Sequence, residues 1–378
     1  MALLVSGLAL NSVTASGAFG TSHGATSTWS ISFTQNRSWP LGAITCPTAE
    51  FCVAEDGTTV QQTTNGGTRW TADPVEKNYT VYDVSCPKSD VCRGVGTKDG
   101  NWQSFMTETT ASTWVASSKT VDEMEPTAVM ALSCPSVNEC VAVGANNLIG
   151  GNSNGYPTWT ATNLARSPAI TAANWKSALI PFPRSSIVVG LSGISCPSVT
   201  TCYAITDHYD AGAILLRTTS SSASWSIVRV TIKGMVPLRE LETSSITDIS
   251  CATTTSCTIV GLNESNRLLI LQTKNGGVSW RWTVESGLGK ALLGQVQPRV
   301  SCASTAVCAV TDGFTFYRST NGGATWAKEP APRGAGLPLS LSCPSVSTCF
   351  ATTTNGVVGS GPKARFPGQI LVFEAPHS

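Results

Sequence analysis

The sequence has little charge of either sign, since Asp, Glu, Lys and Arg make up only 12% of its 378 residues. With 24 basic and 23 acidic residues, the net charge of +1 provides no broad positive field for nucleic-acid phosphates or anionic lipids. No apolar run reaches the ~18 residues that a membrane-spanning helix needs. The three histidines, His23, His208 and His377, are too few for a multi-histidine metal centre. These absences argue against a nucleic-acid binder and an integral membrane protein, and we expect no cofactor.

Apolar residues make up 41% of the chain, enough to bury a sizeable core, so we expect a folded globular protein. At the start, a short apolar stretch from Ala2 to Leu10 precedes small residues, with Ser16 and Ala18 placed as at a signal-peptidase site. The basic residues that usually precede such a stretch are missing. We therefore interpret residues 1–18 as a signal peptide or a disordered N-terminus, and residues 19–378 as a single domain.

All 14 cysteines occur in seven pairs with the same C-x5-C spacing, and none is left over. A seven-residue segment such as CPSVSTC can turn back and bring its two Cα atoms within bridging distance, so we predict seven local disulfides. Zinc is the less favoured alternative, because zinc pairs are usually closer in sequence and histidine is scarce. Since disulfides persist in oxidising compartments, we expect a secreted or cell-surface protein. The pairs are Cys46/Cys52, Cys86/Cys92, Cys134/Cys140, Cys196/Cys202, Cys251/Cys257, Cys302/Cys308 and Cys343/Cys349.

The cysteine pairs mark a repeat whose first cysteines are 40 to 62 residues apart, a length that suits a four-stranded propeller blade. A second signature follows in three of the units: TTNGGTRW ends at Trp70, TKNGGVSW at Trp280 and STNGGATW at Trp326. Its Asn-Gly and Gly-Gly steps supply the positive φ angles of a tight hairpin turn. Segments rich in Val, Ile, Leu and Thr indicate four short strands per unit, the first ending before the first cysteine and the second starting after the second cysteine. The pattern predicts an all-β fold, a seven-bladed β-propeller with one disulfide in each blade.

The seventh unit ends before its fourth strand. After Cys349 the chain offers a second strand and then a third from Gly368 to Ala375, but no Trp follows. Near the N-terminus, the isolated segment HGATSTWSISFT contains Trp29, which matches the missing strand. We therefore predict that the N-terminal strand completes the last blade, which would close the ring and remove exposed strand edges.

The segments TTNGGTRW, TKNGGVSW and STNGGATW resemble the Asp-box, or BNR, repeat of sialidases, large xyloglucan-active glucanases and the photosystem II stability/assembly factor group, most fully the last. Two departures stand out: Asn65, Asn275 and Asn321 occupy the usual aspartate position, and the cysteine pairs are additional. The chain also resembles exported bacterial proteins with SCPS-x-x-x-C repeats. The resemblance implies a sialidase-like propeller in which the Asp-box turns are structural, and it says little about chemistry.

Candidate binding residues lie on the face of the ring opposite the disulfide loops. In a four-stranded blade, the disulfide loops and the Asn-Gly-Gly turns share one face, whereas the longest and most variable connections fall on the other. Functional residues often occupy such loops on a rigid scaffold. The acidic turn around Asp207 could supply oxygen ligands to calcium, but we predict no metal site. Carboxylates and aromatic side chains suited to a sugar or a peptide give the candidates Asp99, Trp102, Trp175, Asp207, His208, Tyr209 and Asp210.

Three functions remain open from the sequence. The favoured hypothesis is a module that binds a protein or a glycan through the variable-loop face, because no catalytic set is recognisable. A carbohydrate-active enzyme, either a glycoside hydrolase or a lyase that uses carboxylates of the same loops, is the alternative, although the Arg-Ile-Pro segment typical of sialidases is absent. The third hypothesis is a structural envelope or assembly component. We assign no catalytic residue and leave the oligomeric state open.

Overall fold

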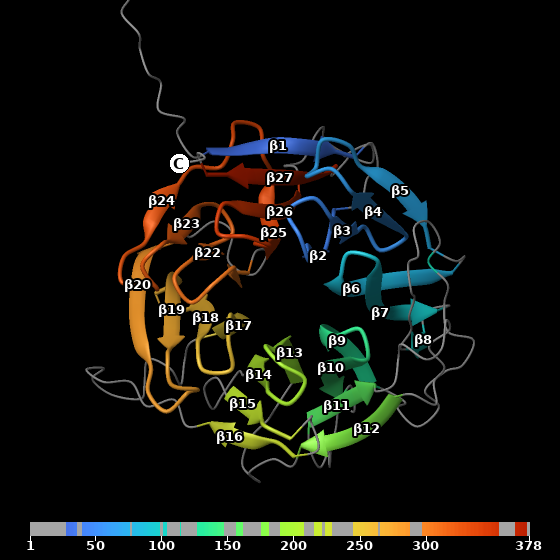
Figure 1. The fold of residues 1–378 in the computed structure, drawn as a ribbon, viewed down its shortest axis with the longest axis vertical. Helices are drawn as coiled ribbons and strands as arrows, with labels where there is room; N and C mark the ends of the chain where they lie inside the picture. Colours follow the sequence, from blue (N-terminus) through green and yellow to red (C-terminus); the bar gives the residue numbers. More distant parts are fainter. Residues whose placement is uncertain are drawn as a thin grey trace, which may run out of the picture.

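The part of the chain that the structure describes forms seven small antiparallel sheets. The computed structural model describes residues 28–35, 40–75, 78–98, 101–103, 114, 127–146, 156–161, 175–180, 190–207, 215–220, 224–228, 245–263, 265–287, 297–354 and 367–375. These residues form strands and turns, and no helix long and apolar enough to span a membrane is found among them. Figure 1 shows the sheets arranged in a circle around a common centre. The predicted all-β class is confirmed, and the arrangement is that of a β-propeller.

We number the sheets 1 to 7 in chain order. Sheet 1 contains β2 (Ile44–Thr45), β3 (Cys52–Glu55), β4 (Thr59–Thr63) and β5 (Thr71–Pro74). Sheet 2 contains β6 (Tyr79–Lys88), β7 (Val91–Lys98) and β8 (Asn101–Gln103). Sheet 3 contains β9 (Thr127–Ser136), β10 (Glu139–Asn146), β11 (Tyr156–Ala161) and β12 (Trp175–Ile180). Sheet 4 contains β13 (Gly190–Ser195), β14 (Cys202–Asp207), β15 (Leu215–Thr218) and β16 (Ser226–Val228).

In these sheets the strands are named from the centre of the ring outward, and the remaining three sheets are built in the same way. Sheet 5 contains β17 (Ser245–Cys251), β18 (Cys257–Leu262), β19 (Arg267–Thr273) and β20 (Arg281–Gly287). Sheet 6 contains β21 (Arg299–Cys302), β22 (Cys308–Thr311), β23 (Phe316–Ser319) and β24 (Ala327–Glu329). Sheet 7 contains β25 (Leu337–Ser342), β26 (Thr348–Thr354), β27 (Gly368–Glu374) and, from the other end of the chain, β1 (Thr28–Thr34).

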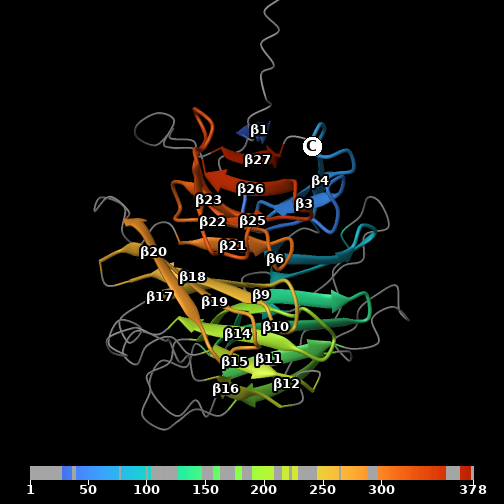
Figure 2. The same cartoon turned by 60° about the vertical axis from the view of Figure 1, so that its left-hand side comes forward.

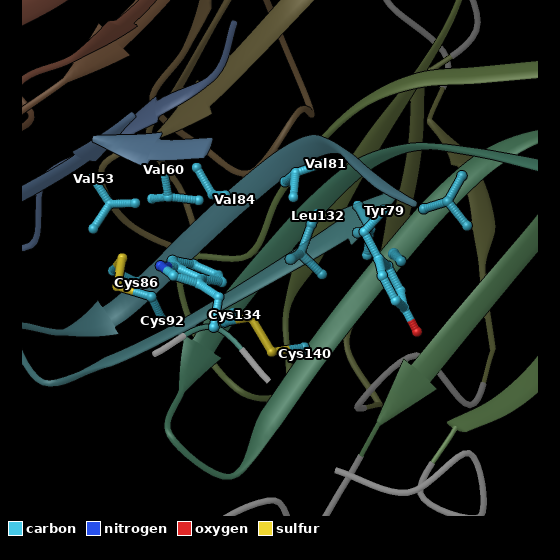
Figure 3. Packing of buried hydrophobic residues seen from close by; sticks show 14 of the residues in the cluster. Val53, Val60, Tyr79, Val81, Val84, Cys86, Cys92, Leu132, Cys134 and Cys140 are labelled. Atoms are coloured by element: carbon cyan, nitrogen blue, oxygen red, sulfur yellow. A yellow bond between two sulfur atoms is a disulfide. The ribbon is translucent and has the colours of Figure 1, made fainter. Parts of the chain in front are cut away.

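The hydrophobic core lies between neighbouring sheets. Figure 3 shows one such cluster, in which Val53 and Val60 of sheet 1 lie near Val84 of sheet 2, while Leu132 and Cys140 come from sheet 3. Because a sheet in the ring is covered on both faces, its middle strands are buried almost throughout, as the RLLILQT sequence of β19 illustrates. Continuous apolar runs of this kind are what strands buried on two sides require.

All seven predicted disulfides are present. In every sheet the bridge joins the end of the first strand to the start of the second, with Cα atoms 4.0 to 4.1 Å apart. No free cysteine remains. Each bridge thus fixes a short hairpin connection, and the confirmed pairing supports the expectation of an oxidising environment.

The placement of the cysteines in the strands differs from the prediction. The sequence pattern predicts strands that stop outside each cysteine pair. The first strands of sheets 1, 4 and 7 do end just before the first cysteine, but Cys86 lies within β6 and Cys92 within β7. Cys92 has no exposed surface, and Figure 3 shows it among the side chains of the core cluster. Cys52 and Cys140, the second cysteines of sheets 1 and 3, are equally buried. These cysteines are therefore core residues as well as bridge partners, because their strands run between neighbouring sheets, and they are not accessible to a ligand.

A circuit of hydrogen bonds runs from sheet to sheet beside the disulfides. The residue just before the first cysteine is Ser or Thr in every unit, and its hydroxyl accepts a hydrogen bond from the N–H of the first cysteine in the following sheet. The circuit closes where Cys46 of sheet 1 donates to Ser342 of sheet 7, at 3.0 Å. The other six acceptors, at 2.8 to 3.3 Å, are Thr45, Ser85, Ser133, Ser195, Ser250 and Ser301.

The N-terminal strand β1 completes sheet 7. As predicted, β1 pairs antiparallel with β27, and Trp29 lies opposite Phe373. Figures 1 and 2 show the two strands side by side at the edge of the ring. The Trp29 ring stacks on Phe316 of sheet 6 at 4.0 Å between centroids, and its Nε1 donates to Glu329 at 3.2 Å. Ser32 of the same strand donates to the Gly67 carbonyl of sheet 1 at 2.6 Å, so β1 contacts both neighbouring sheets.

The Asn-Gly-Gly segments form the expected tight turns. Gly66 and Gly67 have φ angles of 67° and 83°, which favour glycine. The Asn65 carbonyl Oδ1 accepts the Arg69 N–H at 2.9 Å, and the Gly66 N–H donates to Glu50 in the disulfide loop at 3.0 Å. Equivalent bonds from Gly276 and Gly322 recur in sheets 5 and 6. The disulfide loops and these turns therefore share one face of the ring, as the sequence predicts.

Candidate functional site

The residues proposed from the sequence are only partly described by the structure. Asp99, His208, Tyr209 and Asp210 lie outside the described residues. The other three are placed by their strands: Trp102 in β8 of sheet 2, Trp175 in β12 of sheet 3, and Asp207 at the end of β14 in sheet 4. These strand positions belong to three different sheets, and none of them is on an innermost strand. Their part in binding stays a prediction.

A cavity of ≈ 400 Å³ lies at the centre of the ring, and residues from all seven sheets line it. Most of them stand two to four positions before the first cysteine of a repeat, on the innermost strand. Glu55 is an exception: it is the last residue of β3, the second strand of sheet 1, and it precedes the β3–β4 connection. The cavity therefore lies nearer to the variable-loop face than to the disulfide loops.

β-Bulges in the innermost strands shape the cavity wall. In β6 the register shifts between Val81 and Asp83, so that the extra residue, Tyr82, and Asp83 both line the cavity while Val81 and Val84 are buried. Similar shifts occur in β13, β17 and β25. A bulge re-aims neighbouring side chains, which is why two consecutive residues can face the same space.

Two aspartates occupy equivalent positions, three residues before the first cysteine in sheets 2 and 5. Asp83 accepts the N–H of Val84 at 2.8 Å and that of Leu132 in sheet 3 at 2.7 Å. Asp248 accepts the N–H of Ile249 at 2.8 Å and that of Val300 in sheet 6 at 2.9 Å. Each carboxylate thus links two sheets through backbone groups, while it also forms part of the cavity wall.

Arg299 occupies the same repeat position in sheet 6. Its Nε donates to the Leu339 carbonyl at 2.9 Å, and Nη1 donates to the Thr247 carbonyl at 3.4 Å. The one ion pair found among the described residues, Lys88 with Asp90, lies on the surface. Arg299 therefore forms no direct ion pair with any carboxylate of the described residues, and backbone carbonyls hold its guanidinium in place.

Burial controls the charge of the cavity. It raises the pKa of Glu55 to about 7, although Glu55 accepts the N–H groups of Ala43 at 2.8 Å and Gly57 at 2.6 Å. Burial also raises the pKa of Asp83 to about 7 and that of Asp248 in the same direction, against the opposing effect of the Arg299 charge. The two groups nearest pH 7, Glu55 and Asp83, thus exist as mixtures of charged and neutral forms at neutral pH.

Large apolar side chains stand exposed beside these charges. Tyr82 is 44% exposed and Met130 is 50% exposed, and both line the cavity together with Leu339. Large apolar side chains gathered at a concave surface commonly mark a binding site. The central cavity therefore combines an apolar wall, one guanidinium and three carboxyl groups.

Glu55, Asp83, Asp248 and Arg299 are not among the residues predicted from the sequence, because that prediction favoured the variable loops. A signal existed in the aligned repeats. Three residues before the first cysteine, four units have a small residue, whereas sheets 2, 5 and 6 have a charged one. The four small residues are Ala43, Ala131, Gly193 and Ser340.

Comparison with known proteins reveals similarity of fold. No protein-family model and no curated protein matches the chain. A structure described as "YCF48 bound to D1 peptide" is 11% identical, with a TM-score of 0.59, covering 93% of this chain and 96% of that one. YCF48 from Cyanidioschyzon merolae is 16% identical, with a TM-score of 0.58 and coverage of 92% and 99%. The GH74 enzyme of Niastella koreensis is 12% identical, with a TM-score of 0.42 and coverage of 87% and 56%.

At these identities the similarities concern the fold alone. The likeness to YCF48 extends over almost the whole of both chains. It supports the propeller architecture predicted from the repeats.

Proposed function

We propose that this protein is a secreted or cell-surface β-propeller that binds a segment of another protein at its central cavity. The observation that carries the proposal is the composition of the cavity wall, where the exposed Tyr82 and Met130 adjoin Arg299 and Asp83. Covering the two apolar side chains would remove them from water, and the charged groups would fix the orientation of the bound chain. The description of a YCF48 structure as bound to a peptide supports a protein ligand over a glycan.

We also propose the number of blades in the ring and the location of the protein. We take the described sheets to be the seven blades of one ring that forms a single domain. The seven sheets, the seven disulfides and the closed circuit of hydrogen bonds support this count. The disulfides also support an extracellular or other oxidising location. The candidates Trp102, Trp175 and Asp207 lie on strands outside the innermost ones of sheets 2, 3 and 4, so they would take part in binding only if the ligand extends outward beyond the cavity.

Selection of peptides from a displayed library of random 12-residue sequences tests this function. The protein is purified with its disulfides intact, and a cavity-filling variant, Met130→Trp, is compared with Val278→Trp. Val278 is 74% exposed on the Asn-Gly-Gly turn of sheet 5, so its replacement places the same indole on the disulfide-loop face. We expect selected peptides to bind the wild type and V278W but not M130W. Failure to enrich any peptide, or equal binding to M130W, would reject the proposal.

A carbohydrate-active enzyme is the second candidate, and the raised pKa values of Glu55 and Asp83 favour it. A carboxyl group that stays protonated near neutral pH can act as a general acid beside an ionised carboxylate. Incubation with a panel of polysaccharides, followed by measurement of released reducing ends, tests this reaction. Activity that disappears in Asp83→Asn but persists in Asp73→Asn, a substitution on the outer strand β5, would support the enzyme.

A further inference from the structure

The charges around the cavity do not balance. Glu55, Asp83 and Asp248 contribute three carboxyl groups, whereas Arg299 contributes the single basic side chain among the described lining residues. Arg299 is held by the Leu339 and Thr247 carbonyls rather than by the carboxylates. When all three carboxyl groups are ionised, the cavity therefore has an excess of negative charge that no basic side chain on its described wall offsets.

The apolar part of the wall suits the stem of a long basic side chain. Tyr82 and Met130, on adjacent sheets 2 and 3, are among the few large apolar residues with high exposure in the described part of the chain. The stems of lysine and arginine pack on apolar surfaces while their charged ends seek polar partners, and aromatic faces attract cations. A cavity of ≈ 400 Å³ falls within the range that accommodates small ligand groups.

We propose that the cavity receives a lysine or arginine side chain of the bound protein segment, with its charged end among Asp83, Asp248 and Glu55 and its stem against Tyr82 and Met130. This inference rests on the proposed binding function and specifies the ligand. An acidic side chain is disfavoured, because it would add a fourth negative group to a site in which the guanidinium already donates to backbone carbonyls. A purely apolar side chain would leave the three carboxyl groups without a cation.

The proposal makes binding sensitive to pH. Burial is the main cause that raises the pKa values of Glu55 and Asp83 to about 7. The charges of Asp83 and Asp56 raise the pKa of Glu55 further, and for Asp83 the charge of Asp248 raises it while that of Arg299 lowers it. A bound cation favours the ionised carboxylates, so protons leave the cavity on binding. Since a group with a pKa of about 7 changes from about one tenth to about nine tenths ionised between pH 6 and pH 8, affinity should rise about tenfold per group over that range.

The test uses four pools of immobilised 12-residue peptides whose central residue is fixed as lysine, arginine, norleucine or glutamate, with the other positions random. Retention of the wild-type protein is measured at pH 6 and pH 8. We expect the lysine and arginine pools to retain the protein at least about tenfold better than the norleucine and glutamate pools at pH 8, and the advantage to shrink at pH 6.

Protein variants locate the effect. Asp83→Asn and Asp248→Asn should lose most of the preference for basic pools, whereas Asp73→Asn, on the outer strand, should keep it. Arg299→Gln removes the positive group facing Asp83 and Asp248, so retention on the lysine pool should increase at least about threefold. A gain confined to the lysine and arginine pools would not follow from partial unfolding, because newly exposed apolar surface would increase retention on the norleucine pool as well. Thermal melting of each variant identifies those that fold, and the comparison of pools on the wild type decides the question if an aspartate variant does not.

The outcomes separate the two proposals. If no pool retains the protein, peptide binding itself fails. If all four pools retain it equally, or if the glutamate pool is preferred, a peptide binds but the cavity does not select a basic side chain, and the present inference is refuted. Unchanged or weaker retention of a folded R299Q variant would also contradict it.

Discussion

Replacing Trp29 by alanine should loosen the sheet in which the two ends of the chain meet. The indole is only 4% exposed, and it stacks on Phe316 of sheet 6 while its own strand belongs to sheet 7. Removing a buried aromatic side chain costs about 3 to 5 kcal/mol, the sum of lost burial and the cavity left behind. The buried part of the Glu329 carboxyl would also lose its donor, which adds about 1 kcal/mol.

Two further variants separate these contributions. Trp29→Phe keeps an aromatic ring against Phe316 but removes the Nε1 donor, so it should cost about 1 to 2 kcal/mol. Ile31→Ala changes a 39% exposed residue on the same strand and should cost less than about 1 kcal/mol.

Unfolding in guanidinium chloride with intact disulfides, followed by tryptophan fluorescence and by circular dichroism, measures the differences. The expected order of stability is wild type and I31A, then W29F, then W29A. If W29A unfolds within about 1 kcal/mol of the wild type, β1 does not hold the ring closed, and the reasoning from its contacts is wrong.

Three other predictions concern stability. In the folded protein the pKa values of Glu55 and Asp83 are about 7, above their ordinary values, so their contribution to stability is complete below about pH 4 and declines as the pH rises to about 7. The denaturation midpoint should therefore fall between about pH 4 and about pH 7, and it should fall less steeply in Glu55→Gln. An identical slope in that variant would contradict the assignment. Replacing Cys302 and Cys308 together by serine removes one short bridge and should lower stability by about 2 kcal/mol in the same unfolding assay, and no change would show that the loop stays ordered without it. Asn321→Asp should preserve the turn of sheet 6, because a carboxylate oxygen can accept the Thr325 N–H that Oδ1 of Asn321 accepts at 3.0 Å. Asn321→Ala cannot accept this hydrogen bond and should lower stability by about 1 kcal/mol. Equal losses of stability in the two variants would show that the side-chain hydrogen bond does not stabilise the turn.

The repeat made much of the fold predictable. Each C-x5-C pair is a local feature, since its two cysteines are bridged within one hairpin connection, and each Asn-Gly-Gly segment dictates a turn through backbone conformations that glycine tolerates. The sequence pattern alone matched the isolated segment around Trp29 to the missing strand of the last unit. The pairing of β1 with β27 confirms this match. The burial of Cys92 could not be predicted from the repeat, because it depends on the sheets that flank its strand.

The candidate site could not be predicted in the same way. Asp83, Asp248 and Arg299 stand at one repeat position in three different sheets. The aligned repeats show that this position carries charge in those sheets, but they do not show that its side chains line one cavity. The bulge that places Tyr82 beside Asp83 is likewise invisible in the pattern, because it depends on the register with the neighbouring strand. The variable-loop candidates remain predictions for the same face of the molecule.

The amino-acid sequence by itself determined the strands, the turns, the disulfides and the number of repeats, because these depend on contacts between residues close along the chain. Only the tertiary structure decided that Glu55, Asp83, Asp248 and Arg299 surround one cavity and that burial raises the pKa values of its carboxyl groups. The physical reason is that desolvation and charge interactions depend on distances in space, and in a ring the residues that meet at the centre come from every part of the chain.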